Sequence, residues 1–358
     1  MPSQKFESKN NKLNMKITYK YILFVILGVI LGTILMTAIF YNQLFNNSGY
    51  GRSPISSDNR LDNGKYKFVR PILNSGYGDE SETLKWFPAE RKLKSAVQDI
   101  VAQSPDIKSS VFFLNLDNSG WFGVNTADTF IPASLLKLPM LISYYKLRET
   151  EKDLFEQKIN YEGQDYNDLK NIGNGTIKPG NTYSVKELLR EMIVHSDNNA
   201  LQLLYAYRQN SLKLIFDDLK IPLPSTDGEI AVSDFVTTRD VGRFMLVLYN
   251  ASYLNIEDSE EVLKILSETE FKDGLTAGVP DGTTVSHKFG ERTIENTSES
   301  LKAELHDCGI VYHPRIPYVV CIMTKGNDLN TQKQLIQKIS KRIYEGVTQF
   351  SEVGSENK

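Results

Sequence analysis

The sequence predicts an α+β fold, in which an antiparallel sheet is flanked by helices and joined to an all-helical lobe, with a site between the lobes. Residues 111–124 alternate apolar and polar side chains around Asn118-Ser119-Gly120, which is a hairpin signal. Residues 308–326 form a second such hairpin near the other end of the chain. Between them, residues 184–266 carry apolar side chains at helical spacing. Because strands and helices come in separate runs, the pattern favours α+β.

The individual elements follow from local signals. Helical spacing over residues 84–103 ends before Ser104-Pro105. Ser184 and Glu187 form a capping box that starts a helix with a single apolar stripe. Further elements are predicted as helices over 200–208, 241–248, 262–266 and 328–350 and as a strand over 285–291. The polar stretch 163–181 is expected to be a loop, because its glycines lack the G-K-[ST] ending of a phosphate loop.

The front of the chain predicts a membrane anchor. Residues 21–41 are apolar and carry no charge, a length sufficient to cross a bilayer. Lysines are frequent in residues 1–20, so this segment is expected in the cytoplasm and the rest of the chain outside, in a single-pass protein of the cell membrane. A cleaved signal peptide is the alternative, but it needs a shorter apolar run and small residues at a cleavage site.

Composition sets the remaining boundaries. Residues 42–80 are predicted as an extracytoplasmic linker in which the more apolar 66–73 could dock on the domain. Residues 81–350 are predicted as one catalytic domain, followed by a polar tail at 351–358. The net charge of -3 gives no indication of a nucleic-acid partner, and a monomer is expected.

The chain has two cysteines, Cys308 and Cys321. If the second hairpin turns at Pro314-Arg315, the two lie opposite each other on neighbouring strands. Either a cross-strand disulfide or two buried free thiols is compatible with this placement. No His or Cys spacing indicates zinc, and no metal or other cofactor is expected.

The most informative stretch is Ser134-Leu-Leu-Lys137, where a turn runs into an apolar helix. A serine and a lysine three residues apart lie on one face of a helix, one turn apart. A serine hydroxyl needs a base to become a nucleophile, and a buried lysine can lose its proton and act as that base. By itself the pattern is also compatible with a capping serine and a solvated lysine.

Two later patterns change this interpretation. Ser196-Asp197-Asn198 follows about sixty residues on, and Lys288-Phe289-Gly290 about ninety residues after that. S-x-x-K, S-D-N and K-T-G in this order are the motifs of penicillin-recognising active-site serine enzymes. The chain therefore resembles class A β-lactamases over roughly residues 84–350, and this resemblance implies the β-lactamase/penicillin-binding-protein transpeptidase-like fold.

The resemblance implies catalytic roles for residues of the first two motifs. Ser134 would be the nucleophile and Lys137 the base for acylation. Ser196 would relay a proton toward the leaving nitrogen, and Asn198 would donate a hydrogen bond to the substrate amide. Asp197 is expected to be structural and to hold the turn through backbone hydrogen bonds.

The third motif would bind the substrate. Lys288 would place a positive charge beside a substrate carboxylate, and Gly290 would let the strand backbone approach the ligand. The backbone N–H groups of Ser134 and Glu291 would form the oxyanion hole.

The chain departs from the family pattern in two places. Phe289 stands where the family has Thr or Ser, so a hydroxyl that helps to hold the β-lactam carboxylate is missing. The segment after S-D-N also lacks the E-x-x-L-N element whose glutamate activates the deacylating water. Glu229 and Asp227 are the acidic residues near the expected place, and Glu229 is the candidate base.

The leading hypothesis is a membrane-anchored serine hydrolase that forms an acyl-enzyme with β-lactams or related acyl-D-amino-acid amide bonds. A D,D-carboxypeptidase or endopeptidase acting on peptidoglycan stem peptides is the second reading, favoured by the missing glutamate. A catalytically quiet peptidoglycan-binding module is the third, and the joint presence of the three motifs argues against it.

Overall fold

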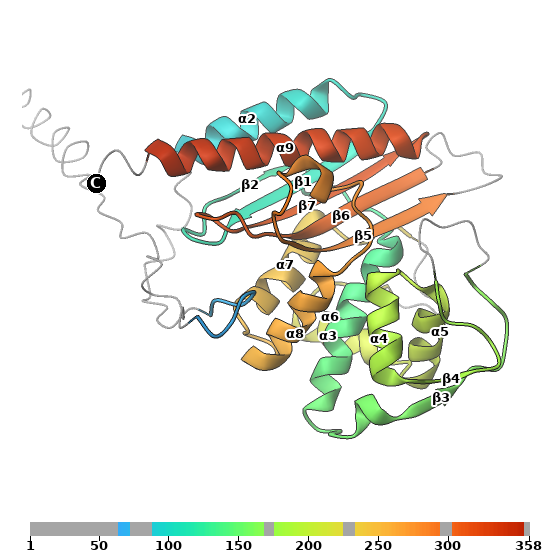
Figure 1. Cartoon of the computed structure of the whole chain (residues 1–358). Helices are drawn as coiled ribbons and strands as arrows, with labels where there is room; N and C mark the ends of the chain where they lie inside the picture. The colour runs from blue at the N-terminus through green and yellow to red at the C-terminus, as the bar shows by residue number, and fades with distance from the viewer. Residues whose placement is uncertain (1–63, 72–87, 168–174, 225–232, 294–302, 354–358) are drawn as a thin grey trace, which may run out of the picture. The chain divides into compact units, whose positions relative to one another are not determined.

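The computed structural model describes residues 64–71, 88–167, 175–224, 233–293 and 303–353, which all belong to one compact unit. Its centre is a five-stranded sheet in the order β2-β1-β7-β6-β5, with every neighbouring pair antiparallel (Figure 1). The strands are β1 (Lys108–Asn115), β2 (Trp121–Val124), β5 (Val285–Thr293), β6 (Ala303–Val311) and β7 (Tyr318–Gly326). The predicted α+β class and both predicted hairpins are confirmed.

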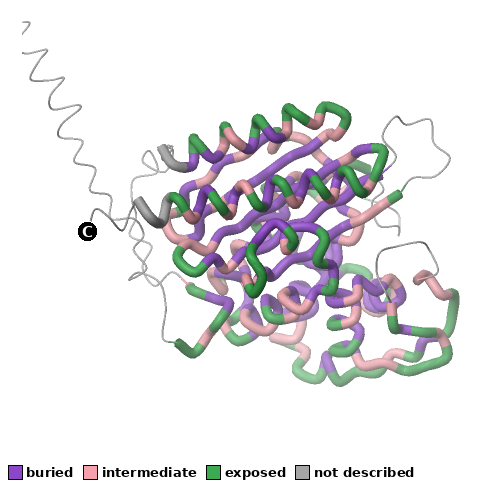
Figure 2. The backbone as a smooth tube through the Cα atoms, turned by 45° about the horizontal axis from the view of Figure 1, so that its top comes forward, coloured by how far each residue is buried: buried purple, intermediate pink, exposed green. Residues whose placement is uncertain are grey.

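Two long helices, α2 (Pro88–Ala102) and α9 (Leu329–Val353), lie along one face of this sheet (Figure 1). Phe113 of β1 packs with residues of both helices in a buried cluster. Its neighbour Phe112 belongs to a second cluster shared with the helical part of the fold. Because successive side chains of a strand point to opposite faces, the sheet is buried on both sides, as the burial colours of Figure 2 show.

The helical part packs against the other face. It is formed by η3 (Ala133–Leu136), α3 (Lys137–Arg148), η4 (Leu154–Glu156), α4 (Val185–Val194), α5 (Asn198–Tyr207), α6 (Ser211–Asp218), α7 (Thr238–Tyr249) and α8 (Ile256–Ser267), with η5 (Thr276–Gly278) beside α9. The capping box predicted at Ser184 is present at the start of α4. Helix α6 and the small sheet of β3 (Lys158–Asn160) and β4 (Thr182–Ser184) were not predicted. Neither short strand carries an apolar alternation, and the apolar stripe of α6 extends over only 8 residues.

The second hairpin settles the cysteine alternatives. Strands β6 and β7 pair Cys308 directly with Cys321, which places the turn at Pro314-Arg315 as expected. The two residues are joined by a disulfide, and the structure therefore selects the disulfide over two free thiols.

The segment 64–71 docks on the domain instead of extending away from it. The backbone N–H groups of Lys67, Phe68 and Val69 all donate to the Glu260 carboxylate on α8, at 2.6, 2.8 and 3.0 Å. Val69 is fully buried there. The predicted anchor, residues 21–41, lies outside the described residues, and within these no helix has the length and apolarity to span a membrane.

Candidate active site

The segment that carries Ser134 is a helical turn under backbone constraint. Ser134 lies in η3, which continues directly into α3 at Lys137. The preceding residue, Ala133, has a φ of +47°, a left-handed conformation that non-glycine residues rarely adopt. Leu135 and Leu136 are buried and anchor the turn, while Ser134 keeps partial exposure. Ser134 is thus held, partly exposed, at the start of a helix.

Lys137 is completely buried and faces oxygens of the S-D-N turn. Its Nζ donates to the backbone oxygen of Ser196 at 2.5 Å, to the Ser196 Oγ at 3.1 Å and to the Asn198 Oδ1 at 2.8 Å. Burial lowers the pKa of Lys137 to about 7, although the nearby Asp197 carboxylate acts in the opposite direction. A substantial fraction of this amine is therefore neutral at physiological pH, as a general base requires.

The S-D-N triplet forms the break between α4 and α5. Ser196 has a φ of +53°, the second strained backbone position at the site. Asp197 is buried and is the N-cap of α5, where its Oδ1 accepts the Ala200 N–H and its Oδ2 accepts the Ile177 N–H. As expected, Asp197 holds the turn through backbone hydrogen bonds.

Lys288 reaches the same serine from strand β5. Its Nζ donates to the Ser196 Oγ at 3.0 Å and to the Phe289 backbone oxygen at 3.0 Å. Burial, and then repulsion by Lys137, lower the pKa of Lys288 well below its usual value, with Asp307 opposing the shift. The structure thus joins the three sequence motifs through a single hydroxyl, that of Ser196, placed between two buried amines.

Gly290 brings strand β5 against the turn of the nucleophile. A Cβ at this position would lie 2.8 Å from the Pro132 backbone oxygen and 3.1 Å from the Leu135 backbone nitrogen, so only glycine fits without displacing the strand. The backbone at Glu291, the next residue along β5, therefore passes beside the start of η3. An oxyanion hole shared by the backbone N–H groups of Ser134 and Glu291 stays a prediction.

Phe289 packs where a hydroxyl was expected. Its ring is buried and stacks on Phe271, with 4.3 Å between the centroids. The Lys288 Nζ lies 4.0 Å from the centroid of the same ring. The aromatic ring thus offers the Lys288 ammonium a cation–π contact in place of a hydroxyl partner.

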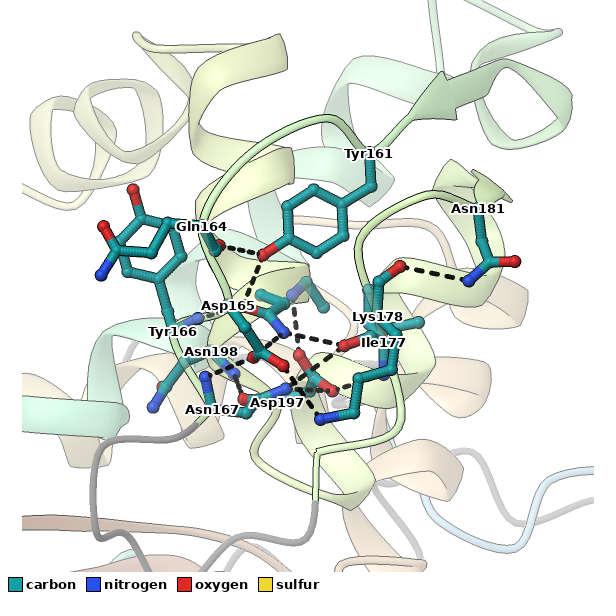
Figure 3. Close-up of polar contacts among 12 residues, drawn as sticks. Tyr161, Gln164, Asp165, Tyr166, Asn167, Ile177, Lys178, Asn181, Asp197 and Asn198 are labelled. Carbon is teal, nitrogen blue, oxygen red and sulfur yellow. Dashed lines mark hydrogen bonds and ion pairs between the residues drawn. The ribbon is translucent and has the colours of Figure 1, made fainter.

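The polar stretch 163–181, predicted as a loop, contacts the S-D-N turn (Figure 3), and sequence reasoning missed these contacts. The buried Asn199 side chain accepts from the Tyr161 hydroxyl and the Tyr166 N–H, and it donates to the Asp165 carboxylate and the Ile177 backbone oxygen. Hydrogen bonds from Asn199 and then from the Asn167 backbone lower the pKa of Asp165 to about 2. The available signal was Asn199, the residue directly after S-D-N, because a polar residue needs such partners when it is buried.

A second missed residue lies beneath the turn of the nucleophile. His306 on β6 is buried, its Nδ1 accepts the Thr324 N–H, and its Nε2 lies 2.9 Å from the Ile131 backbone oxygen. Because Nδ1 accepts, Nε2 carries the proton and donates to Ile131. Sequence gave no signal for this contact, since residues 131 and 306 are brought together only by the fold.

Some expectations lie beyond the described residues. Glu229 and Asp227, the candidate deacylation bases, fall in residues 225–232 and have no described position. Across the described ranges, no group of three or more His, Cys, Asp and Glu side chains could hold a metal.

Fold and site together define an active-site serine hydrolase. The chain belongs to the β-lactamase enzyme family, whose model matches residues 92–347. No curated protein is significantly similar to it in sequence.

Solved structures share the fold. One is PBP-A, 22% identical, with 72% of this chain and 96% of that chain covered at a TM-score of 0.62. A PBP-A mutant solved as an acyl-enzyme complex with penicillin G has the same identity and TM-score, with 74% of this chain and all of that chain covered. A class A β-lactamase from Bacteroides cellulosilyticus is 21% identical and covers 72% of this chain and 98% of its own at a TM-score of 0.59.

Proposed function

We propose that this serine hydrolase of the β-lactamase type forms an acyl-enzyme through Ser134 with β-lactams and with related acyl-D-amino-acid amides. The observation that carries the proposal is the Ser196 hydroxyl held between the buried amines of Lys137 and Lys288. A structural domain has no need for two buried lysines, since each unpaired buried cation destabilises the fold.

This geometry supports an acylation step in which Lys137 is the base. Neutral Lys137 takes the proton of the Ser134 hydroxyl, whose oxygen attacks the substrate carbonyl carbon. The N–H groups of Ser134 and Glu291 stabilise the resulting oxyanion. The carbon–nitrogen bond then breaks while Ser196 gives its proton to the leaving nitrogen and regains one from Lys137. A substrate carboxylate beside Lys288 would favour the ammonium form of that residue and offset its burial.

Deacylation is proposed to be slow. Hydrolysis of the ester needs a base to activate water, which contributes roughly 10²–10⁴ in rate. The chain lacks the family's glutamate element, so Glu229 is the proposed base, with Asp227 as the alternative. Slow deacylation favours penicillin-binding behaviour, and the acyl-enzyme with penicillin G of the PBP-A mutant is consistent with it.

The domain is proposed to lie outside the cell, tethered by residues 21–41. The Cys308–Cys321 disulfide supports this location, because disulfides persist in oxidising compartments and are rare in the cytosol. Protease added to intact cells should release the domain and leave a small membrane fragment. Complete protection of the domain would contradict this orientation.

Intact mass spectrometry of residues 55–358 with benzylpenicillin tests the central proposal. The compact unit should gain the mass of one penicillin, and Ser134→Ala should gain none. Followed over time, product release should show a burst of one equivalent and then a slow steady state. An adduct that persists in Ser134→Ala would exclude this nucleophile, and fast turnover without a burst would show a competent water-activating base.

Two other functions remain distinguishable. A D,D-carboxypeptidase would also release the terminal D-amino acid from a stem-peptide analogue, a product that mass spectrometry detects directly. A quiet peptidoglycan-binding module would form no adduct with either compound. The two buried lysines argue against the module, because a binding surface does not require a depressed lysine pKa.

A further inference from the structure

Asn167, a residue of the neighbouring loop, forms hydrogen bonds with the S-D-N turn through its side chain (Figure 3). The Asn167 Oδ1 accepts the backbone N–H of Asn198 at 2.9 Å, and the Asn167 Nδ2 donates to the Asp197 Oδ2 at 3.1 Å. One side-chain amide therefore holds two consecutive residues of the turn. The Asn198 N–H belongs to the first turn of α5, where backbone donors have no partner within the helix.

Asn198 connects Asn167 to the catalytic residues. Its Oδ1 accepts a hydrogen bond from the Lys137 Nζ at 2.8 Å. Because that oxygen faces the lysine, the Nδ2 group of Asn198 is the donor available to a substrate carbonyl. A change in the orientation of Asn198 would thus disturb the substrate contact, while Lys137 keeps its two hydrogen bonds to Ser196.

The loop is built to keep Asn167 in place. The Asn167 backbone N–H donates to the Asp165 Oδ1 at 2.9 Å, in a short turn that fixes the direction of the side chain. A Cβ on Gly175 would lie 2.1 Å from the Asn167 Nδ2, so only glycine leaves room for the amide. Both observations concern residues outside the three motifs.

We propose that Asn167 is a positioning residue that orients the side-chain donor of Asn198 toward the acylamino carbonyl of the substrate. The inference rests on the proposed acylation of Ser134. Its consequence is selectivity: disturbing Asn167 should impair substrates that use the Asn198 donor more than substrates that cannot.

Acylation kinetics with two penicillins test this selectivity. Benzylpenicillin has an acylamino carbonyl, whereas 6-aminopenicillanic acid has none. Asn167→Ala should lower the second-order acylation constant for benzylpenicillin about tenfold, the order expected for one lost hydrogen bond, and should change that for 6-aminopenicillanic acid less than about threefold. Asn181→Ala is the matched control and should leave both constants unchanged. Among the described residues, the side chain of this exposed asparagine bonds only the Lys178 backbone oxygen.

A double-mutant cycle distinguishes positioning from general loosening. In an Asn198→Ala background, Asn167→Ala should cause no further loss with benzylpenicillin, because the residue that it orients is gone. Additive losses, or equal losses with both penicillins, would overturn the proposal. If Asn167→Ala does not fold, Gly175→Ala displaces the same side chain and should give the same selective loss.

Amide hydrogen exchange gives a readout that does not depend on the substrate. Protection of residues 196–200 should fall in Asn167→Ala and stay unchanged in Asn181→Ala. Unchanged protection in Asn167→Ala would overturn the proposal even if the kinetics fell. If the parent enzyme were not acylated by either penicillin, the proposed function would fail, and the exchange data would still decide whether Asn167 holds the turn.

Discussion

Two clusters of buried charge lie on the same face of the sheet, and they are organised in opposite ways. At the site, Lys137 and Lys288 contact hydroxyl and carbonyl oxygens, and within the described part of the chain neither forms an ion pair with a carboxylate. On β6, the buried carboxylate of Glu304 lies 3.2 Å from the Lys325 ammonium and 3.3 Å from the His306 ring.

The difference is visible in the pKa values. Burial lowers the pKa of Lys137 to about 7, because the opposing Asp197 carboxylate does not offset the lost hydration. Burial also acts to raise the pKa of Glu304, but His306 and Lys325 outweigh it and bring that pKa below its usual value. In the β6 cluster (Glu304, His306 and Lys325), the neighbouring groups thus favour the charged carboxylate of Glu304. The uncompensated lysines of the site become reactive at the expense of stability.

The largest effect should follow from removing the uncompensated base. Lys137→Ala should lower the acylation constant by about 10²–10⁴, the usual contribution of a general base. Unfolding stability should not decrease in proportion, because the variant also removes a buried amine without a counter-charge. Stopped-flow acylation and urea unfolding measure the two quantities.

Lys186→Ala is the matched control, because this lysine of α4 is largely exposed and forms an ion pair with Glu261 on the surface. It should leave acylation unchanged. Acylation of Lys137→Ala at a near-normal rate would mean that another group serves as the base.

The second prediction concerns the β6 cluster, where removing the charge of Glu304 takes away the compensation. Glu304→Gln keeps the shape of the side chain but removes the nearer of two carboxylates beside Lys325, the other being Asp234 at 3.9 Å. It should destabilise the domain by about 3 kcal/mol, as breaking a buried pair does. Acylation of the folded fraction should change less than about threefold. Urea unfolding and active-site titration separate these outcomes, and a selective loss of acylation would show that the β6 cluster belongs to the catalytic machinery.

Sequence reasoning recovered the fold and the motifs because both are encoded locally. Helical stripes, hairpin turns and the capping box at Ser184 depend on neighbouring residues, and S-x-x-K places Lys137 one turn after Ser134. The contacts of Asn167 and His306 are different, because each joins segments distant in sequence. Such polar partners are chosen by tertiary packing and leave no periodic pattern.

The third prediction concerns the disulfide that lies between the two clusters. Cys308 is directly opposite Lys288 on β5 and two residues from His306 on β6. Replacing both cysteines with serine should cost about 2–3 kcal/mol of unfolding free energy, because the closed loop is short and the hairpin ladder remains. Chemical denaturation measures this loss. Acylation should stay within about threefold, and a larger drop would mean that the disulfide positions Lys288.

The smallest effect, and the one that contrasts the clusters most directly, is that of pH. Because acylation needs neutral Lys137, the acylation rate constant should rise about tenfold from pH 6 to 8 and level off above the Lys137 pKa of about 7.

The pH dependence of stability separates the two clusters. The unfolded lysine titrates near 10.4, so between about pH 7 and 10 the unfolded state binds more protons, and this residue makes stability rise with pH. The Glu304 contribution is present above its unfolded pKa of about 4.3 and is lost as pH falls through its lower folded value. The free energy of unfolding should be measured from pH 3 to 10. In Glu304→Gln, part of its dependence at low pH should be lost. In Lys137→Ala, part of its rise above pH 7 should be lost. If each variant instead changed the other end of the profile, the assignment of compensated and uncompensated charge would be wrong.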